Sequence, residues 1–196
     1  MPIETAEAPK PSTEALRALL PAFIASAGIR QAAPHFAASL LASPQSLASP
    51  SLSYPVYALG LADVVAGGGV RKAKLSAWRH EFAAEGEVVS GRRPHFAGLN
   101  VNSRFRSVLQ ELRLVSEAAD FAGKLYEARL LQISAMGVRA LWLKAKSRSH
   151  ADAVIPLAPT RRELIAGRHY SFEEFTAALK GAAEAMLAAE APGKGA

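Results

Sequence analysis

Two eight-residue runs rich in strand-forming residues, 126–133 and 138–145, are separated only by Ser134, Ala135, Met136 and Gly137. A short connection that ends in glycine is typical of a β-hairpin. A second pair of such runs, 75–82 and 87–90, flanks a turn at 83–86. Residues 153–157 are a further candidate strand, which Pro156 would place at a sheet edge. Because hairpins dominate and no series of βαβ units appears, the pattern favours an antiparallel sheet.

Two amphipathic helices are expected beside this sheet. Apolar residues recur at helical spacing from Val101 to Val115, with Asn100 or Asn102 as the candidate N-cap. Further along, Ser171 and Glu174 form a capping box, which predicts a helix beginning at Phe172. We therefore predict an α+β fold, an antiparallel sheet of about four to five strands with helices packed on one face.

The chain is expected to fall into five segments. Residues 1–12 are predicted to be a disordered tail, and residues 13–42 a helical N-terminal segment that Pro21 breaks or kinks. Residues 43–55 contain three prolines and five serines, and such a composition predicts a strap without regular structure. Residues 56–190 form the predicted α+β domain, and residues 191–196 a frayed tail.

Composition excludes several classes of site. The chain has no cysteine, so disulfides, thiolate catalysis and zinc sites built on sulfur are excluded. The acidic N-terminal residues do not resemble a signal peptide, and the apolar stretch 18–29 is too short to cross a bilayer. We expect a cytoplasmic protein that does not contact a membrane.

No motif of an established catalytic site is present. Gly67, Gly68 and Gly69 precede two cations but lack the spacing of a phosphate-binding loop, so they predict a flexible turn. The five histidines are isolated in the sequence, and a metal site would require distant residues such as His80 and His95 with Glu81 or Glu87 to converge. We therefore predict no metal and no cofactor, and no catalytic residue can be named.

Positive charge is concentrated in the middle of the chain. Residues 61–150 hold 15 basic and eight acidic residues, whereas the flanking regions are close to neutral. Arginines at the start of the expected helix oppose its dipole, and an anionic partner would relieve this. The candidate residues for binding an anion or a nucleic acid are Arg71, Lys72, Lys74, Arg79, Arg92, Arg93, His95, Arg104 and Arg106.

Three classes of function stay open at this point. The lack of a catalytic signature favours a non-enzymatic binding or assembly module that contacts another protein chain or a second copy of itself as a homo-oligomer. The basic segment 71–106 supports the alternative of a protein that binds nucleic acid or another anion. An enzyme whose site assembles from distant residues is the third class.

Overall fold

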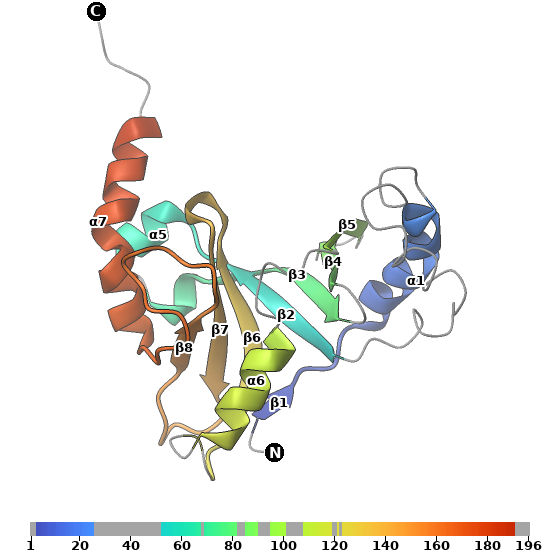
Figure 1. Ribbon diagram of the computed structural model, residues 1–196, viewed down its shortest axis with the longest axis horizontal. Helices are drawn as coiled ribbons and strands as arrows, with labels where there is room; N and C mark the ends of the chain where they lie inside the picture. Colours follow the sequence, from blue (N-terminus) through green and yellow to red (C-terminus); the bar gives the residue numbers. More distant parts are fainter. Residues whose placement is uncertain are drawn as a thin grey trace, which may run out of the picture. The chain divides into compact units, whose positions relative to one another are not determined.

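The computed structural model describes residues 3–25, 52–67, 69–81, 85–89, 95–100, 108–118, 121 and 123–190 (Figure 1). The chain divides into two compact units. Unit 1 comprises residues 1–4, 57–74 and 104–196, and unit 2 comprises residues 5–56 and 75–103. Both units combine strands with helices, and the described strand pairings are antiparallel. The coarse prediction of a mixed fold with a mostly antiparallel sheet is thus confirmed.

The sheet of unit 1 is organised around a long hairpin. Strand β6 (Tyr126–Ile133) pairs with β7 (Val138–Ala145) over its whole length, and the bounds match the two runs that the sequence indicates. The 3₁₀ turn η3 (Ser134–Met136) connects them, and Gly137 follows with a φ of 65°, a conformation that favours glycine. Strand β8 (Ala153–Pro156) pairs with β7, and β1 (Ile3–Thr5) pairs with β6.

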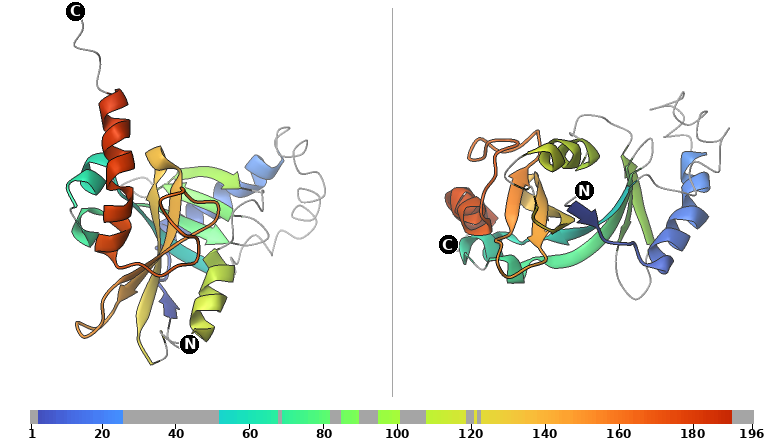
Figure 2. Two further views of the ribbon diagram at one scale, coloured as in Figure 1. Left: turned by 60° about the vertical axis from the view of Figure 1, so that its left-hand side comes forward. Right: turned by 90° about the horizontal axis from the view of Figure 1, so that it is seen from below.

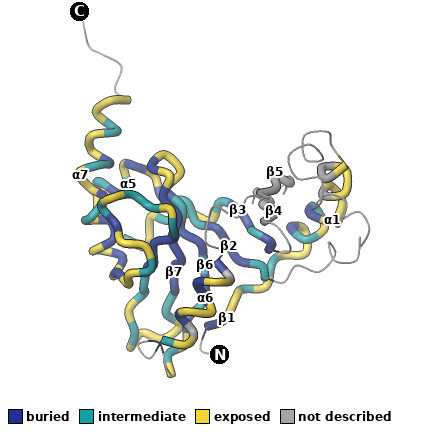
Figure 3. Tube along the Cα trace, viewed as in Figure 1, coloured by how far each residue is buried: buried dark blue, intermediate teal, exposed yellow. Residues whose placement is uncertain are grey.

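Both faces of this hairpin are buried, as the dark tube of β6 and β7 shows (Figure 3). Trp142 and the residues that alternate with it pack against helix α7 (Phe172–Glu190) and the short helix α5 (Leu61–Val65). Leu141 and Leu143 point to the opposite face and are fully buried. Helix α6 (Val108–Glu117) lies on that side of the strands (Figure 2). The prediction that all helices pack on one face is therefore wrong, because this sheet is apolar on both sides.

Helix α7 begins as the capping box predicts. The backbone N–H of Glu174 donates to Ser171 Oγ at 3.1 Å, and the Ser171 N–H donates to the Glu174 carboxylate at 2.8 Å. Tyr170 and Phe175 are both buried on the two sides of this cap. Phe172, Phe175 and Leu179 form the buried face, with Ala182 and Met186 partly buried beside it.

Unit 2 contains a second antiparallel arrangement. Strand β3 (Lys74–Glu81) pairs with β4 (Glu85–Val89), so the predicted hairpin pairing is confirmed, with strand bounds that differ from the predicted ones. Strand β4 then pairs with β5 (His95–Asn100), and helix α1 (Lys10–Ile24) packs against β4 and β5. Strand β5 was not predicted, because the sequence His-Phe-Ala-Gly-Leu-Asn carries glycine and asparagine, which are depleted in strands.

The N-terminal prediction requires correction. Residues 1–12, predicted to be a disordered tail, contain strand β1 and the start of helix α1, and the side chain of Ile3 in β1 is only 6% exposed. Helix α1 begins at Lys10 and continues through Pro21 to Ile24 without the predicted break. The other residues of the predicted segment 13–42 lie outside the described residues, apart from Ala25.

Strand β2 (Leu52–Ala58) begins inside the segment 43–55, for which no regular element was predicted. Tyr54, Pro55 and Val56 are buried there, so packing holds an extended backbone that serine and proline alone do not favour. Residues 43–51 lie outside the described residues. So do 101–107, including the start of the predicted helix; its described part is α6, where Val108, Leu112 and Val115 are buried.

Candidate functional site

A surface cavity of about 400 Å³ lies in unit 1, at the end of the sheet where β6 begins and β7 ends. Three parts of the chain line it: Phe121, Lys124 and Tyr126, then residues 149–153, and then residues 169–171. Its volume lies within the usual range for small-ligand sites. The cavity is the best candidate for a functional site in the described part of unit 1.

Backbone pairing brings these segments together. Val154 of β8 and Tyr170 form an isolated antiparallel bridge, with N–H to O distances of 2.8 and 2.9 Å in the two directions. This bridge places residues 169–171 beside the start of β8. At the same end, Tyr126 is paired with Ala145, so the first residue of β6 lies beside the loop that leads from β7 to β8.

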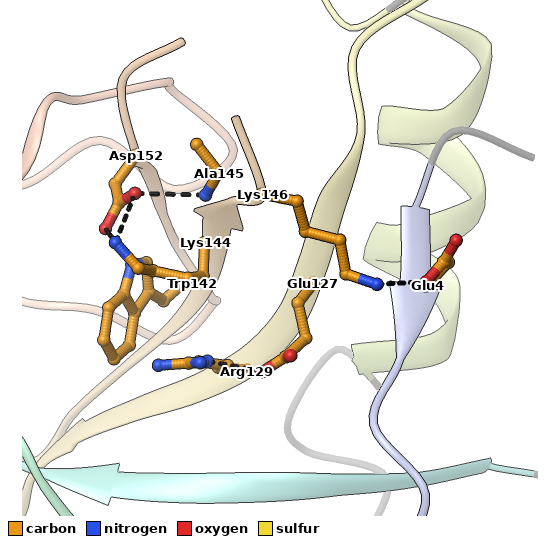
Figure 4. Close-up of polar contacts among 8 residues, drawn as sticks. All are labelled: Glu4, Glu127, Arg129, Trp142, Lys144, Ala145, Lys146 and Asp152. Carbon is orange, nitrogen blue, oxygen red and sulfur yellow. Dashed lines mark hydrogen bonds and ion pairs between the residues drawn. The ribbon is translucent and has the colours of Figure 1, made fainter. Parts of the chain in front are cut away.

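Asp152 holds that loop in place (Figure 4). Its Oδ2 accepts a hydrogen bond from the Trp142 indole at 3.0 Å, and its Oδ1 accepts from the Ala145 backbone N–H at 3.0 Å. The Lys144 ammonium group donates to both oxygens at 3.1 Å. Each carboxylate oxygen thus has two donors, and the charge is balanced by Lys144. Asp152 therefore acts as a structural anchor in the cavity wall rather than as an available base.

Aromatic rings form the apolar part of the cavity. Phe121 makes edge contacts with Tyr126, at a centroid distance of 5.6 Å, and with His169, at 4.7 Å. Burial and the nearby charge of Asp152 raise the pKa of Tyr126 above its ordinary value, so its hydroxyl keeps its proton and can donate a hydrogen bond. Tyr170 is also buried in the lining, and its hydroxyl accepts the N–H of Ile165.

Polar side chains occupy the rest of the lining. Lys124 and His150 are half-buried, whereas His169, Ser149 and Ser171 are exposed. Asp152 supplies the acidic side chain among these described lining residues. The cavity lining therefore contains an ammonium group, two imidazoles and several hydroxyls, together with the carboxylate of Asp152.

A nearby arginine has a different role. The Arg129 guanidinium lies 4.7 Å from the ring centre of Tyr57 and 4.8 Å from that of Trp142, and its Nε donates to Glu127 at 2.7 Å (Figure 4). Figure 4 also shows Lys146 paired with Glu4 of β1. These cations are engaged within the sheet, and they stabilise it through cation–π and ionic contacts.

Unit 2 contains a separate buried polar cluster around His80. Its Nε2 hydrogen-bonds the hydroxyl of Ser12 in α1 at 3.0 Å, and its Nδ1 hydrogen-bonds the hydroxyl of Ser53 in β2 at 2.9 Å. A serine beside histidine Nε2 has the arrangement of a nucleophile and its base. However, His80 is completely buried and Ser12 is only 3% exposed, so a substrate could not reach either atom. Burial lowers the pKa of His80 to about 4, so the ring is neutral.

The predicted anion-binding residues are only partly described. Arg71 and Lys72, in the 3₁₀ helix η1 (Val70–Lys72), are exposed, as is Lys74 at the start of β3. Arg79 is half-buried in β3 of unit 2. Arg92, Arg93, Arg104 and Arg106 lie outside the described residues, and so does the side chain of His95 in β5. Of the nine residues, Arg71, Lys72 and Lys74 are exposed and lie within four positions of one another in the sequence.

The described residues of the hypothetical metal site do not converge. His80 and Glu81 are adjacent in β3 and therefore point to opposite faces, where Glu81 accepts a hydrogen bond from Tyr54 at 2.8 Å. The side chains of His95 and Glu87 lie outside the described residues. Within the described part of the chain, no three acidic or histidine side chains are placed to share a metal ion. Gly67 and Gly69 have positive φ angles, as a turn requires.

Sequence reasoning missed the cavity because its residues come from three separate segments. His150 and His169 looked isolated, since each has no second histidine nearby in the sequence. One usable signal was their position: both lie in loops next to predicted elements, where functional residues are concentrated.

None of the helices in the described part of the chain has both the length and the apolar composition of a bilayer-spanning helix. Comparisons with protein family models, curated proteins and solved structures gave no match to this chain.

Proposed function

We propose that this chain is a non-enzymatic binding module and that it holds its partner through the cavity of unit 1. The observation that carries the proposal is the convergence of aromatic rings with Lys124, His150 and His169 around one opening of about 400 Å³. An apolar floor with a few polar groups is the usual composition of a binding site. The occupied hydrogen-bonding positions of Asp152 favour binding over acid–base chemistry.

Blocking the cavity tests this proposal. Ala151 is an exposed lining residue, so Ala151→Trp should fill the opening without disturbing the core. Ala135, an exposed residue of the η3 turn in the same unit, offers a matched control as Ala135→Trp. Small acids, amines and neutral compounds would be screened against the isotope-labelled full chain by amide NMR.

We expect some compounds to shift the amides of residues 149–153 and 169–171, and Ala151→Trp but not Ala135→Trp to abolish these shifts. The proposal fails if no class of compound affects these amides, or if the blocking variant binds as well as the control.

A second candidate is association through exposed aliphatic side chains. Leu114 on α6 is 48% exposed and Ile165 is 59% exposed, both within unit 1. An exposed apolar patch often marks a surface that contacts another protein. Light scattering coupled to size exclusion would compare the intact chain with the double variant Leu114→Gln, Ile165→Gln. A smaller particle in the variant would support this candidate, and an unchanged mass would reject it.

A further inference from the structure

We infer that the cavity of unit 1 selects a neutral ring compound whose carbonyl oxygen accepts a hydrogen bond from the Tyr126 hydroxyl. This inference rests on the proposed function and names the class of its ligand. It is drawn from a hydrogen-bond donor that the fold leaves open in the lining, from the charges around that donor and from the aromatic surface beside it.

Tyr126 supplies the open donor. It lines the cavity and is only 4% exposed. Within the described part of the chain its hydroxyl makes no hydrogen bond. By contrast, the hydroxyls of Tyr170, Ser149 and Ser171 each have a hydrogen-bonding partner within the chain. A buried polar group without a partner is unfavourable, and an acceptor atom on a ligand would satisfy it. The hydroxyl of Tyr126 is therefore the point at which we expect a ligand to be held.

The surroundings of this hydroxyl favour an uncharged acceptor. Burial, and after it the charge of Asp152, raises the pKa of Tyr126, so the hydroxyl keeps its proton and the ligand has to supply the acceptor. The same negative charge that opposes ionisation of the phenol also opposes an anion placed beside it. A carbonyl oxygen accepts the hydrogen bond without adding a charge, and it is therefore preferred to a carboxylate.

The charged side chains of the lining are engaged within the protein. Both oxygens of Asp152 accept hydrogen bonds from the Lys144 ammonium group, so a cationic ligand would have to compete with Lys144. Lys124 and His169 each have an interaction within the protein that a charged ligand would have to share or replace. An ion entering the cavity would lose its water without a partner ready to replace it. This cost favours a neutral ligand.

The other lining residues define the body of the ligand. Phe121 and Tyr170 are buried aromatic residues of the lining, and Ala151 and Ala153 leave room beside them. A carbonyl compound without an apolar group would leave this surface in contact with water, so a carbonyl attached to a ring fits better. A single substituted ring can be accommodated in about 400 Å³. The half-buried imidazole of His150 can add a second hydrogen bond to a neutral polar group.

Four probes of similar shape test the inference: benzamide, benzoate, benzamidinium and toluene. Benzamide is neutral and has a carbonyl oxygen, benzoate and benzamidinium carry opposite charges on the same outline, and toluene has no acceptor. Each is titrated into the isotope-labelled full chain at constant ionic strength, and the amides of residues 149–153 and 169–171 report binding. We expect benzamide to bind more tightly than each of the other three probes.

Tyr126→Phe removes the hydroxyl and keeps the ring that contacts Phe121. It should weaken the binding of benzamide about five-fold, because a neutral hydrogen bond is lost, and leave the binding of toluene unchanged. Tyr57→Phe is the matched control, since Tyr57 belongs to unit 1 but lies outside the lining. If Tyr126→Phe does not fold, the comparison of benzamide with toluene in the unaltered chain measures the same preference for an acceptor.

The inference is overturned if benzoate, benzamidinium or toluene binds the cavity as tightly as benzamide, and the proposed function would then survive. It is also overturned if benzamide binds Tyr126→Phe as tightly as the unaltered chain, or if Tyr57→Phe weakens binding as much as Tyr126→Phe. If a screened compound binds but none of the four probes does, the inference fails alone. If neither a probe nor a screened compound binds, both proposals fail.

Discussion

Mild acid is expected to destabilise unit 2 through His80. The ring is fully buried between Ser12 and Ser53, and it hydrogen-bonds both hydroxyls. A neutral imidazole has one donor and one acceptor nitrogen, so one serine accepts from the ring and the other donates to it. Protonation makes both nitrogens donors and places a charge where no water is available. The hydrogen bond in which the ring accepts from a serine hydroxyl depends on the neutral form, because a protonated nitrogen can only donate.

The size of the effect follows from the pKa of His80. It is lowered from 6.5 to about 4 by burial, so the unfolded chain binds this proton more readily than the folded chain does. The stability contributed by the neutral ring is therefore complete above pH 6.5 and is lost as the pH falls toward 4. Each pKa unit corresponds to about 1.4 kcal/mol, so the total loss is about 3 kcal/mol. Between about pH 7.5 and about pH 5, the loss should be about 2 kcal/mol.

Urea unfolding at these two pH values measures the loss. Trp78 lies in β3 of unit 2 and Trp142 in unit 1, so a Trp142→Phe background makes fluorescence report unit 2. His80→Gln retains a donor and an acceptor but does not titrate. In this background, acidification should lower the free energy of unfolding of the protein with His80 by about 2 kcal/mol more than that of the His80→Gln protein.

The exposed His169 provides the control, because His169→Gln should leave the pH dependence unchanged. Equal losses in the proteins with and without His80 would refute the reasoning. A direct NMR titration of the His80 ring gives an independent check that does not require the variant to fold. A midpoint near the ordinary histidine pKa of 6.5 would show that burial does not keep the ring neutral.

Three further predictions concern unit 1, each measured by urea unfolding with Trp142 fluorescence in a Trp78→Phe background. Asp152→Ala should lower the free energy of unfolding by about 3 kcal/mol, because buried donors lose their acceptor. An unchanged midpoint of urea unfolding would show that water replaces the carboxylate. Ser171→Ala should lower the free energy of unfolding by about 1 kcal/mol, because the helix loses its N-cap. An unchanged free energy of unfolding would mean that the cap adds nothing to stability. Phe175→Ala should cost about 3–5 kcal/mol through the cavity left in the core, and a loss under about 1 kcal/mol would contradict its placement at the centre of the α7 contact.

The elements that the sequence predicted well are those that local interactions decide. The β6–β7 hairpin matches residue for residue, since its turn ends at Gly137 and its strands are rich in apolar residues. Helix α7 begins at Phe172, because Ser171 and Glu174 satisfy each other's backbone N–H groups. In both cases the deciding partners lie within a few residues of one another.

The missed strands depend on partners far away in the chain. Strand β1 has three residues and pairs with β6, which lies more than 100 positions later. Strand β2 contains Pro55, which cannot donate a backbone hydrogen bond, and local propensity argues against a strand there. Burial of Tyr54 and Val56 outweighs that propensity. No local pattern contains this information, because the favourable free energy arises from contacts made only after folding.

The candidate site was unpredictable for a related reason. The net charge of residues 61–150 directed attention to nine residues between 71 and 106, but the charge of a segment does not say which cations remain available. Arg129 belongs to the same basic region, and the structure places it between two aromatic rings and beside Glu127. Lys144 is paired with Asp152. Whether a basic side chain can bind a ligand depends on its partners in the folded chain, and composition alone does not reveal those partners.

Asp152 shows why this pairing matters for function. Counted as a charge in the sequence, it opposes an anion in the cavity. In the folded chain its two oxygens accept hydrogen bonds from Trp142, Lys144 and Ala145, so it orders the loop and offers little attraction to an incoming cation. The carboxylate therefore orders the loop that forms one wall of the cavity, and loss of Asp152 should weaken this loop.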